Sequence, residues 1–274
     1  MQTKILIFIT FIALIYSCND KNQKEMTKEN KAIFLHHSTG NTIWRGTVSK
    51  ITWKLSKEGN LQKWVKKYNK KNGTNYLVEE LAFPKKSPYG WRNFPYDYYT
   101  IWVKNAGEKA FMEEPTLEML TKEYGLIIWK HCYPVSDISE DTGTPDINAE
   151  EHRLENYKVQ YEALKEKMHS FPDTKFLVWT GATHSKTNTT EEKAKRMKEF
   201  TDWVRNDWNE KGDNIFLWDF YELETEGDLY IKDEYTLKEG DSHPSRPFAE
   251  GLIPLFGKRI IDVFTGKADK SDIT

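Results

Sequence analysis

Short apolar runs alternate with longer amphipathic segments along this chain of 274 residues. Five of the runs are candidate strands, and most of them are short and continuously apolar: Ala32–His36, Tyr76–Ala82, Leu126–Lys130, Lys175–Thr180 and Asn214–Phe220. A continuous apolar run indicates a strand that is covered on both faces, as the strands of parallel sheets are.

Helical periodicity fills the gaps between these strands. An apolar stripe spaced by three and four residues predicts a helix over Glu150–His169. A capping box from Thr189 to Glu192 predicts the start of another helix. Two more stripes predict a short helix and the last helix: Leu61, Trp64, Val65 and Tyr68, then Leu252, Ile253, Phe256, Ile260 and Phe264. The alternation predicts an α/β fold, a three-layer α/β/α sandwich of flavodoxin-like type around a mostly parallel five-stranded sheet.

The segment Phe83–Pro115 breaks this regular pattern. It is rich in proline, glycine and aromatic residues, which are densest between Tyr89 and Trp102. We expect an ordered excursion over one edge of the sheet. The rings could stack on sugar faces, but we expect most of them to pack against the domain.

The N-terminus carries export signals. Lys4 precedes an almost wholly apolar run, Ile5–Tyr16, which is shorter than the ~20 residues of a membrane span and fits the core of a signal peptide. Ser17-Cys18 resembles the lipobox of bacterial lipoproteins, in which Cys18 becomes the lipidated N-terminus. An ordinary secretory signal is the alternative. We therefore expect a protein exported to the cell envelope and anchored to a membrane by lipid.

We expect the chain to consist of four segments. Residues 1–18 would be the signal, the polar residues 19–31 a flexible tether, 32–266 a single folded domain and 267–274 a tail. Once Cys18 is acylated, Cys132 is the one remaining cysteine, so no disulfide forms. The net charge is −2, from 40 basic and 42 acidic residues that are interspersed. This pattern argues against a nucleic-acid partner, which requires a basic stripe.

Candidate catalytic groups follow the predicted strands, where ligands bind in open α/β sheets. Five histidines fall at this edge: His36, His37, His131, His184 and His243. Ser38 follows the first strand at a turn into a helix, where free N–H groups favour a developing oxyanion. Asp241 and His243 lie on the loop before the last helix. The alternatives are that Ser38 only caps its helix and that Asp241 and His243 are ordinary turn residues.

This order of residues resembles the SGNH (GDSL-like) hydrolase superfamily over about residues 31–266. Ser38 takes the place of the family's nucleophile, although His36 and His37 stand where the family has Gly-Asp. His243-Pro244 matches the family's His-Pro. The family's acid stands three residues before this histidine, whereas Asp241 stands two before it. Glu239 as the acid, or a Ser–His dyad without one, therefore stays open.

The resemblance also implies an oxyanion hole. Backbone N–H groups at Ser38 and Thr39 would contribute, and Gly90 is the candidate for the family's glycine. The family's Gly-x-Asn-Asp block is missing, and the segment from Trp129 to Tyr133 occupies its place. We expect Lys130 or His131 to face the site instead, with His37 and His184 as further residues of the substrate pocket.

The implied function is a serine esterase that needs no cofactor and acts on an ester, with an acyl group on a glycan as the suggested substrate. Two other classes remain. One is a metal-dependent hydrolase that uses the clustered histidines with Asp241. The other is a non-catalytic glycan-binding lipoprotein on a hydrolase scaffold, which the altered asparagine block favours.

Overall fold

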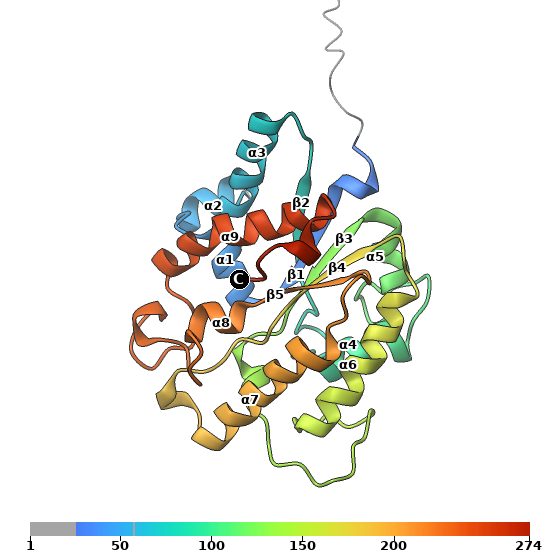
Figure 1. Cartoon of the computed structure of the whole chain (residues 1–274), viewed down its shortest axis with the longest axis vertical. Helices are drawn as coiled ribbons and strands as arrows, with labels where there is room; N and C mark the ends of the chain where they lie inside the picture. Colours follow the sequence, from blue (N-terminus) through green and yellow to red (C-terminus); the bar gives the residue numbers. More distant parts are fainter. Residues whose placement is uncertain (1–25, 57) are drawn as a thin grey trace, which may run out of the picture.

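Five parallel strands form the centre of the protein in a computed structural model, which describes residues 26–56 and 58–274. The strands are β1 (Lys31–His36), β2 (Leu77–Ala82), β3 (Leu126–Trp129), β4 (Lys175–Trp179) and β5 (Ile215–Trp218). Their order is β2-β1-β3-β4-β5, and every pair is parallel (Figure 1). The five strands predicted from apolar runs are confirmed to within two residues at each end.

Helices cover both faces of this sheet (Figure 1). One layer holds α1 (Ser38–Arg45), α2 (Lys50–Ser56), α3 (Asn60–Asn72) and α9 (Arg246–Phe264). The other holds α4 (Pro95–Tyr99), α5 (Leu117–Glu123), α6 (Leu154–His169) and α7 (Glu191–Trp203), and α8 (Phe220–Thr225) follows β5. Along β1, Ile33 packs into one apolar cluster and Phe34 into the other, as the period of a strand requires. The α/β/α sandwich is confirmed.

The remaining elements are short. Single turns of π-helix continue α4 and α7 at Thr100–Lys104 and Val204–Trp208. Short 3-10 turns lie at Lys28–Asn30, Tyr133–Ser136, Lys186–Asn188, Asp233–Tyr235 and Ala268–Lys270.

The register of the sheet sets the place of the site. Leu35 of β1 lies opposite both Leu81 of β2 and Trp129 of β3. The chain therefore leaves β1 and β3 at the same level and at the same edge of the sheet. Ser38 and Cys132 each follow within three residues, beside the point where the strand order reverses.

Two helix starts differ from the predicted ones. The cap of α7 is Thr190, whose side chain accepts from the Lys193 N–H, so the helix starts one residue later than predicted, and Lys193 rather than Glu192 stands three residues after the cap. Helix α6 begins at Leu154 rather than Glu150, because the backbone before it pairs with another loop: the His152 carbonyl accepts from the Ser139 N–H at 2.6 Å.

The aromatic excursion lies over a face of the sheet rather than over its edge. Tyr98 and Trp102 are fully buried, and α4 packs against α6. Phe83 stacks on Trp102 with ring centroids 5.1 Å apart. Most of these rings are therefore core, as expected, although their number alone could not say which face of the sheet they cover.

Both ends of the described chain pack against the domain. The Lys28 carbonyl accepts from the Gly125 N–H at 2.8 Å, so the ordered domain includes the last residues of the segment expected to be a tether. At the other end, Arg259 donates to the Ala268 carbonyl at 2.7 Å, and the Asp219 N–H donates to the Ile273 carbonyl at 2.7 Å. Residues 267–274 are therefore not a free tail. Cys18 and the predicted signal lie outside the described residues.

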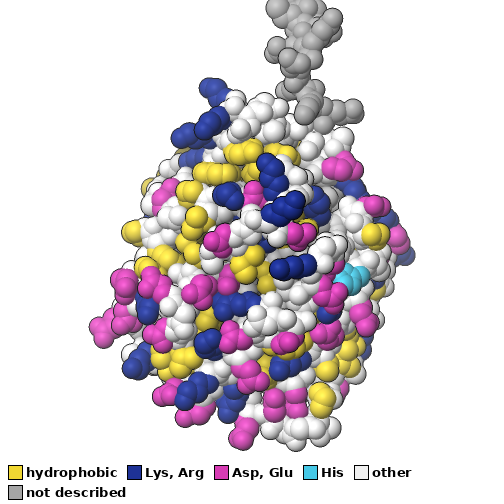
Figure 2. Space-filling view, viewed as in Figure 1, with side chains coloured by type: hydrophobic (Ala, Val, Ile, Leu, Met, Phe, Trp, Pro, Cys, Tyr) yellow, Lys and Arg dark blue, Asp and Glu magenta, His cyan; other side chains and the backbone are white. Residues whose placement is uncertain are grey.

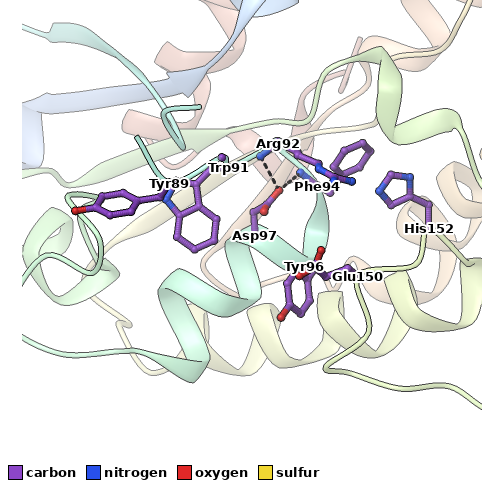
Figure 3. A pocket seen from close by; sticks show the side chains of 9 residues that line it. Tyr89, Trp91, Arg92, Phe94, Tyr96, Asp97, Glu150 and His152 are labelled. Atoms are coloured by element: carbon purple, nitrogen blue, oxygen red, sulfur yellow. Dashed lines mark hydrogen bonds between the residues drawn. The ribbon is translucent and has the colours of Figure 1, made fainter. Parts of the chain in front are cut away.

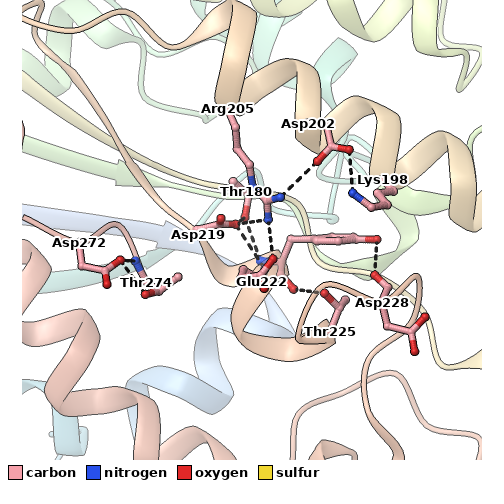
Figure 4. Close-up of polar contacts among 11 residues, drawn as sticks. Thr180, Lys198, Asp202, Arg205, Asp219, Glu222, Thr225, Asp228, Asp272 and Thr274 are labelled. Atoms are coloured by element: carbon pink, nitrogen blue, oxygen red, sulfur yellow. Dashed lines mark hydrogen bonds and ion pairs between the residues drawn. The ribbon is translucent and has the colours of Figure 1, made fainter.

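A partly buried ion pair joins the C-terminal ends of β4 and β5 to the layer of α7 (Figure 4). Arg205 donates to Asp219 Oδ1 at 2.8 Å, and the same oxygen accepts from the Thr180 hydroxyl at 2.8 Å. It also caps α8 by accepting from the Glu222 N–H. One carboxylate oxygen of Asp219 thus connects the end of β4, the π-helical turn after α7 and the start of α8.

The surface agrees with the even distribution of charge in the sequence. On the face shown in Figure 2, basic and acidic side chains are interspersed rather than segregated. Among the described residues, none of the helices combines the length and hydropathy needed to cross a bilayer.

A glycine pair in α9 gives a test of this packing. A Cβ built on Gly257 would lie 2.3 Å from the ring of Trp64 on α3, whereas one on Gly251 would meet nothing within 4 Å. We expect Gly257→Ala to lower the free energy of unfolding by about 1–3 kcal/mol, through overpacking. Gly251→Ala, in the same helix, should raise it by up to about 1 kcal/mol, because alanine is the better helix former. Urea denaturation measures both, and equal effects of the two variants would contradict this packing.

Candidate active site

Asp241 and His243 form a hydrogen-bonded pair on the loop before α9. Asp241 Oδ1 accepts from His243 Nδ1 at 2.8 Å and from the His243 N–H at 2.9 Å. Because a carboxylate can only accept, the ring proton lies on Nδ1, and Nε2 is left to accept a proton. The sequence had left open Glu239 or a dyad without an acid, and the structure places Asp241 against the histidine.

The hydrogen bonds between His243 and Asp241 also keep the Asp241 carboxylate ionised. Partial burial would raise the pKa of Asp241, but the backbone and ring N–H groups of His243 lower it more, and the pKa lies below its ordinary value. Asp241 is therefore ionised at neutral pH. An ionised carboxylate at Nδ1 stabilises the imidazolium that forms when Nε2 takes up a proton.

The Ser242 side chain is turned away from Asp241 and His243, and it holds the loop before α9 in place. Its hydroxyl is 3.1 Å from His184 Nδ1 and accepts from the Ser185 N–H, also at 3.1 Å. Asn188 donates to the same hydroxyl at 3.2 Å. The loop that carries His243 is thus fixed to the loop that follows β4.

Tyr133 completes the support of the histidine. Its ring packs edge-on against His243 and against His184, each with centroids 4.9 Å apart. His184 in turn lies 3.2 Å from Asp137 Oδ2 through Nε2. Burial lowers the pKa of His184, and Asp137 opposes this only in part. His184 therefore supports the loop from behind rather than lining the cavity in front of His243.

Ser38 is the first residue of α1 and is exposed. The cap position belongs to His37, so the alternative in which Ser38 only caps the helix does not describe this structure. Gly40 makes the tight turn possible, because a Cβ there would lie 2.4 Å from the Cβ of His36. The helix therefore starts close against its own strand and presents the Ser38 hydroxyl at the sheet edge.

Ser38, Asp241 and His243 line one cavity of about 400 Å³. Asn41, Thr42 and Arg45 extend the wall along the same face of α1, and Arg246 closes it beyond His243. In the described part of the chain no hydrogen bond joins Ser38 to His243, and Ser38 Oγ instead lies 3.8 Å from Cys132 Sγ. Such a bond is often long or poorly aligned in hydrolases before substrate binds.

Cys132, rather than Lys130, is the neighbour of Ser38 after β3. Lys130 is buried and donates from Nζ to Cys132 Sγ at 3.3 Å, and its ammonium lies over the Trp179 ring. Burial would raise the pKa of Cys132, but the Lys130 charge and the Thr39 N–H lower it more. The expectation that Lys130 faces the site is wrong, because its side chain turns into the core and reaches Ser38 only through the thiol. The backbone N–H of Thr39 is likewise directed at Cys132.

His131 also faces the core and not the site, contrary to expectation. Its Nδ1 is 2.9 Å from the Asn93 carbonyl, and the rings of Tyr98, Trp129 and Tyr161 surround it. Burial lowers the pKa of His131 to about 3. A histidine that is neutral and enclosed in this way holds the aromatic excursion to β3.

The two histidines at the end of β1 have different positions. His36 is buried and lies 2.9 Å from Glu80 Oε2 on β2. His37 bonds through Nε2 to the Pro84 carbonyl, and burial lowers its pKa. His37 also lines a second cavity of about 390 Å³, on the other side of Ser38, together with Trp53, Leu81 and Ala82. His37 therefore lines a cavity beside Ser38, but its ring is held in a structural bond to the backbone.

Gly90 lies in a separate hollow of about 170 Å³ (Figure 3). That hollow is lined by aromatic residues of the excursion, and Asp97 at its floor accepts backbone N–H groups from Arg92 and Phe94. Ser38 lines the two other cavities and not this one. The structure therefore does not bring Gly90 to Ser38, because the excursion folds over the face of the sheet.

The metal-dependent alternative finds no ligand set. Over residues 26–56 and 58–274, no group of three or more His, Cys, Asp or Glu side chains is placed to hold a metal ion. The histidines share an edge of the sheet, but each bonds to a different partner.

The residues that the sequence prediction missed are Cys132, Tyr133, Arg45 and Arg246. Arg45 had a readable signal, since it stands seven residues after Ser38 and so on the same face of the helix. Arg246 stands three residues after His243. For Cys132 and Tyr133, the sequence placed the segment correctly but could not say which of its side chains turn outward.

Comparisons with known proteins add little. No family model matches the chain, and no curated protein matches it. Among solved structures, the chain is similar to a carbohydrate esterase whose active site is described as having divergent catalytic and non-catalytic binding functions. The TM-score is 0.40 with 9% identity, over 88% of this chain and 68% of that one. The function proposed below rests on the geometry of the site alone.

The buried His131 predicts a pH dependence of stability. Its pKa is about 3 in the folded protein and 6.5 in a model peptide, so the unfolded state binds the extra proton between these values. The free energy of unfolding should therefore fall as the pH drops below about 6.5, by up to about 1.4 kcal/mol per pH unit from this group. His131→Phe keeps the ring packing and removes the titration. We expect it to be less stable at pH 7.5 but to show a flatter profile down to pH 4.5 in urea denaturation, and parallel profiles would contradict the assignment.

Proposed function

We propose that this protein is a serine esterase in which Ser38 is the nucleophile, His243 the general base and Asp241 the orienting acid. The observation that carries the proposal is the Asp241–His243 hydrogen bond at 2.8 Å in a cavity that Ser38 also lines. A nucleophile and a base that face one space, with a third group orienting the base, form the arrangement that activates a hydroxyl.

The steps follow from these positions. His243 Nε2 takes the proton of the Ser38 hydroxyl as Oγ attacks the ester carbonyl. The imidazolium then gives this proton to the departing alkoxide, which leaves as the alcohol. A water molecule, deprotonated by the same nitrogen, attacks the acyl-serine, and the proton returns to Ser38 as the acid leaves.

The oxyanion needs donors close to Ser38. The Ser38 N–H is the first of α1 and has no acceptor within its own helix. The helix dipole adds a favourable potential at the same place. Loss of one such donor costs about 3–4 kcal/mol of barrier in well-studied hydrolases, so these groups matter here, where the family's asparagine is absent.

A second candidate is a non-catalytic glycan-binding protein on the same scaffold. The observation in its favour is that Ser38 Oγ contacts the Cys132 thiol and not His243. It predicts that glycan binding survives Ser38→Ala and that no ester is turned over.

Substitution of the three residues tests the proposal. We expect Ser38→Ala and His243→Ala each to lower the hydrolysis of a short acyl ester by about 10³-fold or more, because triad members act as a unit. Asp241→Asn should cost less. Ser56→Ala, at an exposed serine on α2, is the matched control and should keep full activity.

Two further measurements separate the function classes. A serine-directed phosphonate should label the protein with Ser56→Ala but not the one with Ser38→Ala. Activity should survive a strong chelator. Unchanged turnover in Ser38→Ala would end the esterase proposal, and chelator-sensitive turnover would favour the metal-dependent class.

We also propose that the enzyme is exported and anchored to a bacterial membrane through Cys18. The support is the short apolar run that ends at Ser17-Cys18. In a bacterial host, labelled fatty acid should be incorporated into the full chain and not into Cys18→Ala. Equal labelling of both chains would refute the anchor.

A further inference from the structure

Two arginines line the cavity that holds Ser38 and His243. Arg45 is the last residue of α1, and Arg246 is the first residue of α9. Both are partly buried. Arg45 makes one long bond to the Val48 carbonyl at 3.4 Å and lies over the Trp53 ring, while its Nε is buried without a partner. Among the described residues neither guanidinium forms an ion pair.

The nearby carboxylates are already engaged. Asp241 bonds to His243, and Glu80 lies 2.9 Å from His36 Nε2. Glu250, close to Gly46, accepts from the Thr47 N–H at 2.9 Å and from Asn60 at 2.7 Å. Burial and the Arg246 charge lower the pKa of Arg45, and the Glu80 charge opposes this only in part, so the two guanidiniums repel each other. An anion between them would relieve this repulsion.

The spacing of Ser38 and Arg45 along α1 indicates where a charged group of the substrate would lie. Arg45 lies seven residues after Ser38 on one helix face, which is about 10 Å along the axis. A long arginine side chain covers part of this distance. The charged group that it meets would thus sit about one sugar ring away from the ester.

The geometry further indicates which part of an ester enters this cavity. His243 gives its proton to the departing alcohol, so the alcohol part lies on the His243 side, with the arginines. The second cavity lies on the other side of Ser38, and its apolar wall of Trp53, Leu81 and Ala82 suits an apolar acyl group. Its polar wall includes His36, His37 and Glu80, of which His36 and Glu80 bond to each other and His37 bonds to the Pro84 carbonyl.

We infer that the substrate is an ester of an alcohol that carries an anionic oxyacid group, a carboxylate or a phosphate, which Arg45 and Arg246 bind during attack by Ser38. This inference rests on the esterase function proposed above. Guanidinium groups match the planar oxygens of carboxylate and phosphate with paired hydrogen bonds. An O-acetylated uronic acid is the simplest probe with this chemistry.

The test compares two esters with the purified full chain. One is an O-acetylated methyl glucuronide, and the other is the methyl glucoside acetylated at the same position. We expect kcat/KM to be at least tenfold higher for the anionic ester. Arg45→Gln and Arg246→Gln should each lower the ratio of the two kcat/KM values by about tenfold, mostly through KM of the anionic ester.

Arg92→Gln is the matched control. Arg92 is an exposed arginine that lines the separate hollow of Figure 3. Its removal changes the net charge by the same amount and should leave the ratio unchanged. A ratio near one in the parent chain, or an equal loss in all three variants, would overturn the inference. The esterase proposal would survive that result as long as hydrolysis of the neutral ester still required Ser38.

Binding to Ser38→Ala gives a readout that needs no turnover. Calorimetry should detect the anionic ester with Ser38→Ala and find it at least tenfold weaker when Arg246→Gln is added. Equal affinity for the anionic and neutral esters would refute the inference even if no ester were hydrolysed. A third ester, with a phosphate in place of the carboxylate, shows which anion is preferred, and stronger binding of either over the neutral ester supports the inference.

Discussion

The parallel direction of all five strands is the constraint on which the site depends. It brings every strand's carboxyl end to one edge, so segments far apart in sequence meet there. The equal level at which β1 and β3 end sets Ser38 against Cys132. The loop of His243 has no strand of its own and needs a separate attachment, which the Ser242 hydroxyl supplies at the end of β4. Sheet register and one side-chain clamp together place the alcohol and the imidazole on a common cavity.

A histidine at the end of a strand in this protein is not necessarily a catalytic candidate. All five histidines predicted for the edge do lie near strand ends, yet of these five only His243 lines the cavity that Asp241 and Ser38 share. His36, His131 and His184 are enclosed and bonded to groups that hold neighbouring loops. A buried imidazole that stays neutral can bridge two loops at little electrostatic cost, which explains why an edge made of loops gathers histidines that need not react.

The sequence predicted the fold well because its signals are local. A continuous apolar run identifies a buried strand whatever lies around it, and β1, β3, β4 and β5 follow directly, whereas β2 carries Glu79 and Glu80 and is only partly buried. The pair Asp241 and His243 was also readable, since residues two apart in extended chain lie on the same side. Gly90 and His131 were misplaced because their positions depend on how the excursion over Phe83–Pro115 packs, and that is decided by distant partners such as α6. Side-chain direction after β3 likewise depends on tertiary packing, so the segment was found but Cys132 was not singled out.

The Cys132 thiol beside Ser38 shapes the electrostatics of the proposed site. A thiol with a lowered pKa brings partial negative charge. The Lys130 ammonium behind the thiol, whose Nζ lies 3.3 Å from Cys132 Sγ, offsets that charge. The positive potential around Ser38 then comes from Lys130, from the first turn of α1, and from Arg45 and Arg246. A cavity with this balance favours a substrate that brings its own negative charge, because the positive potential attracts the anion.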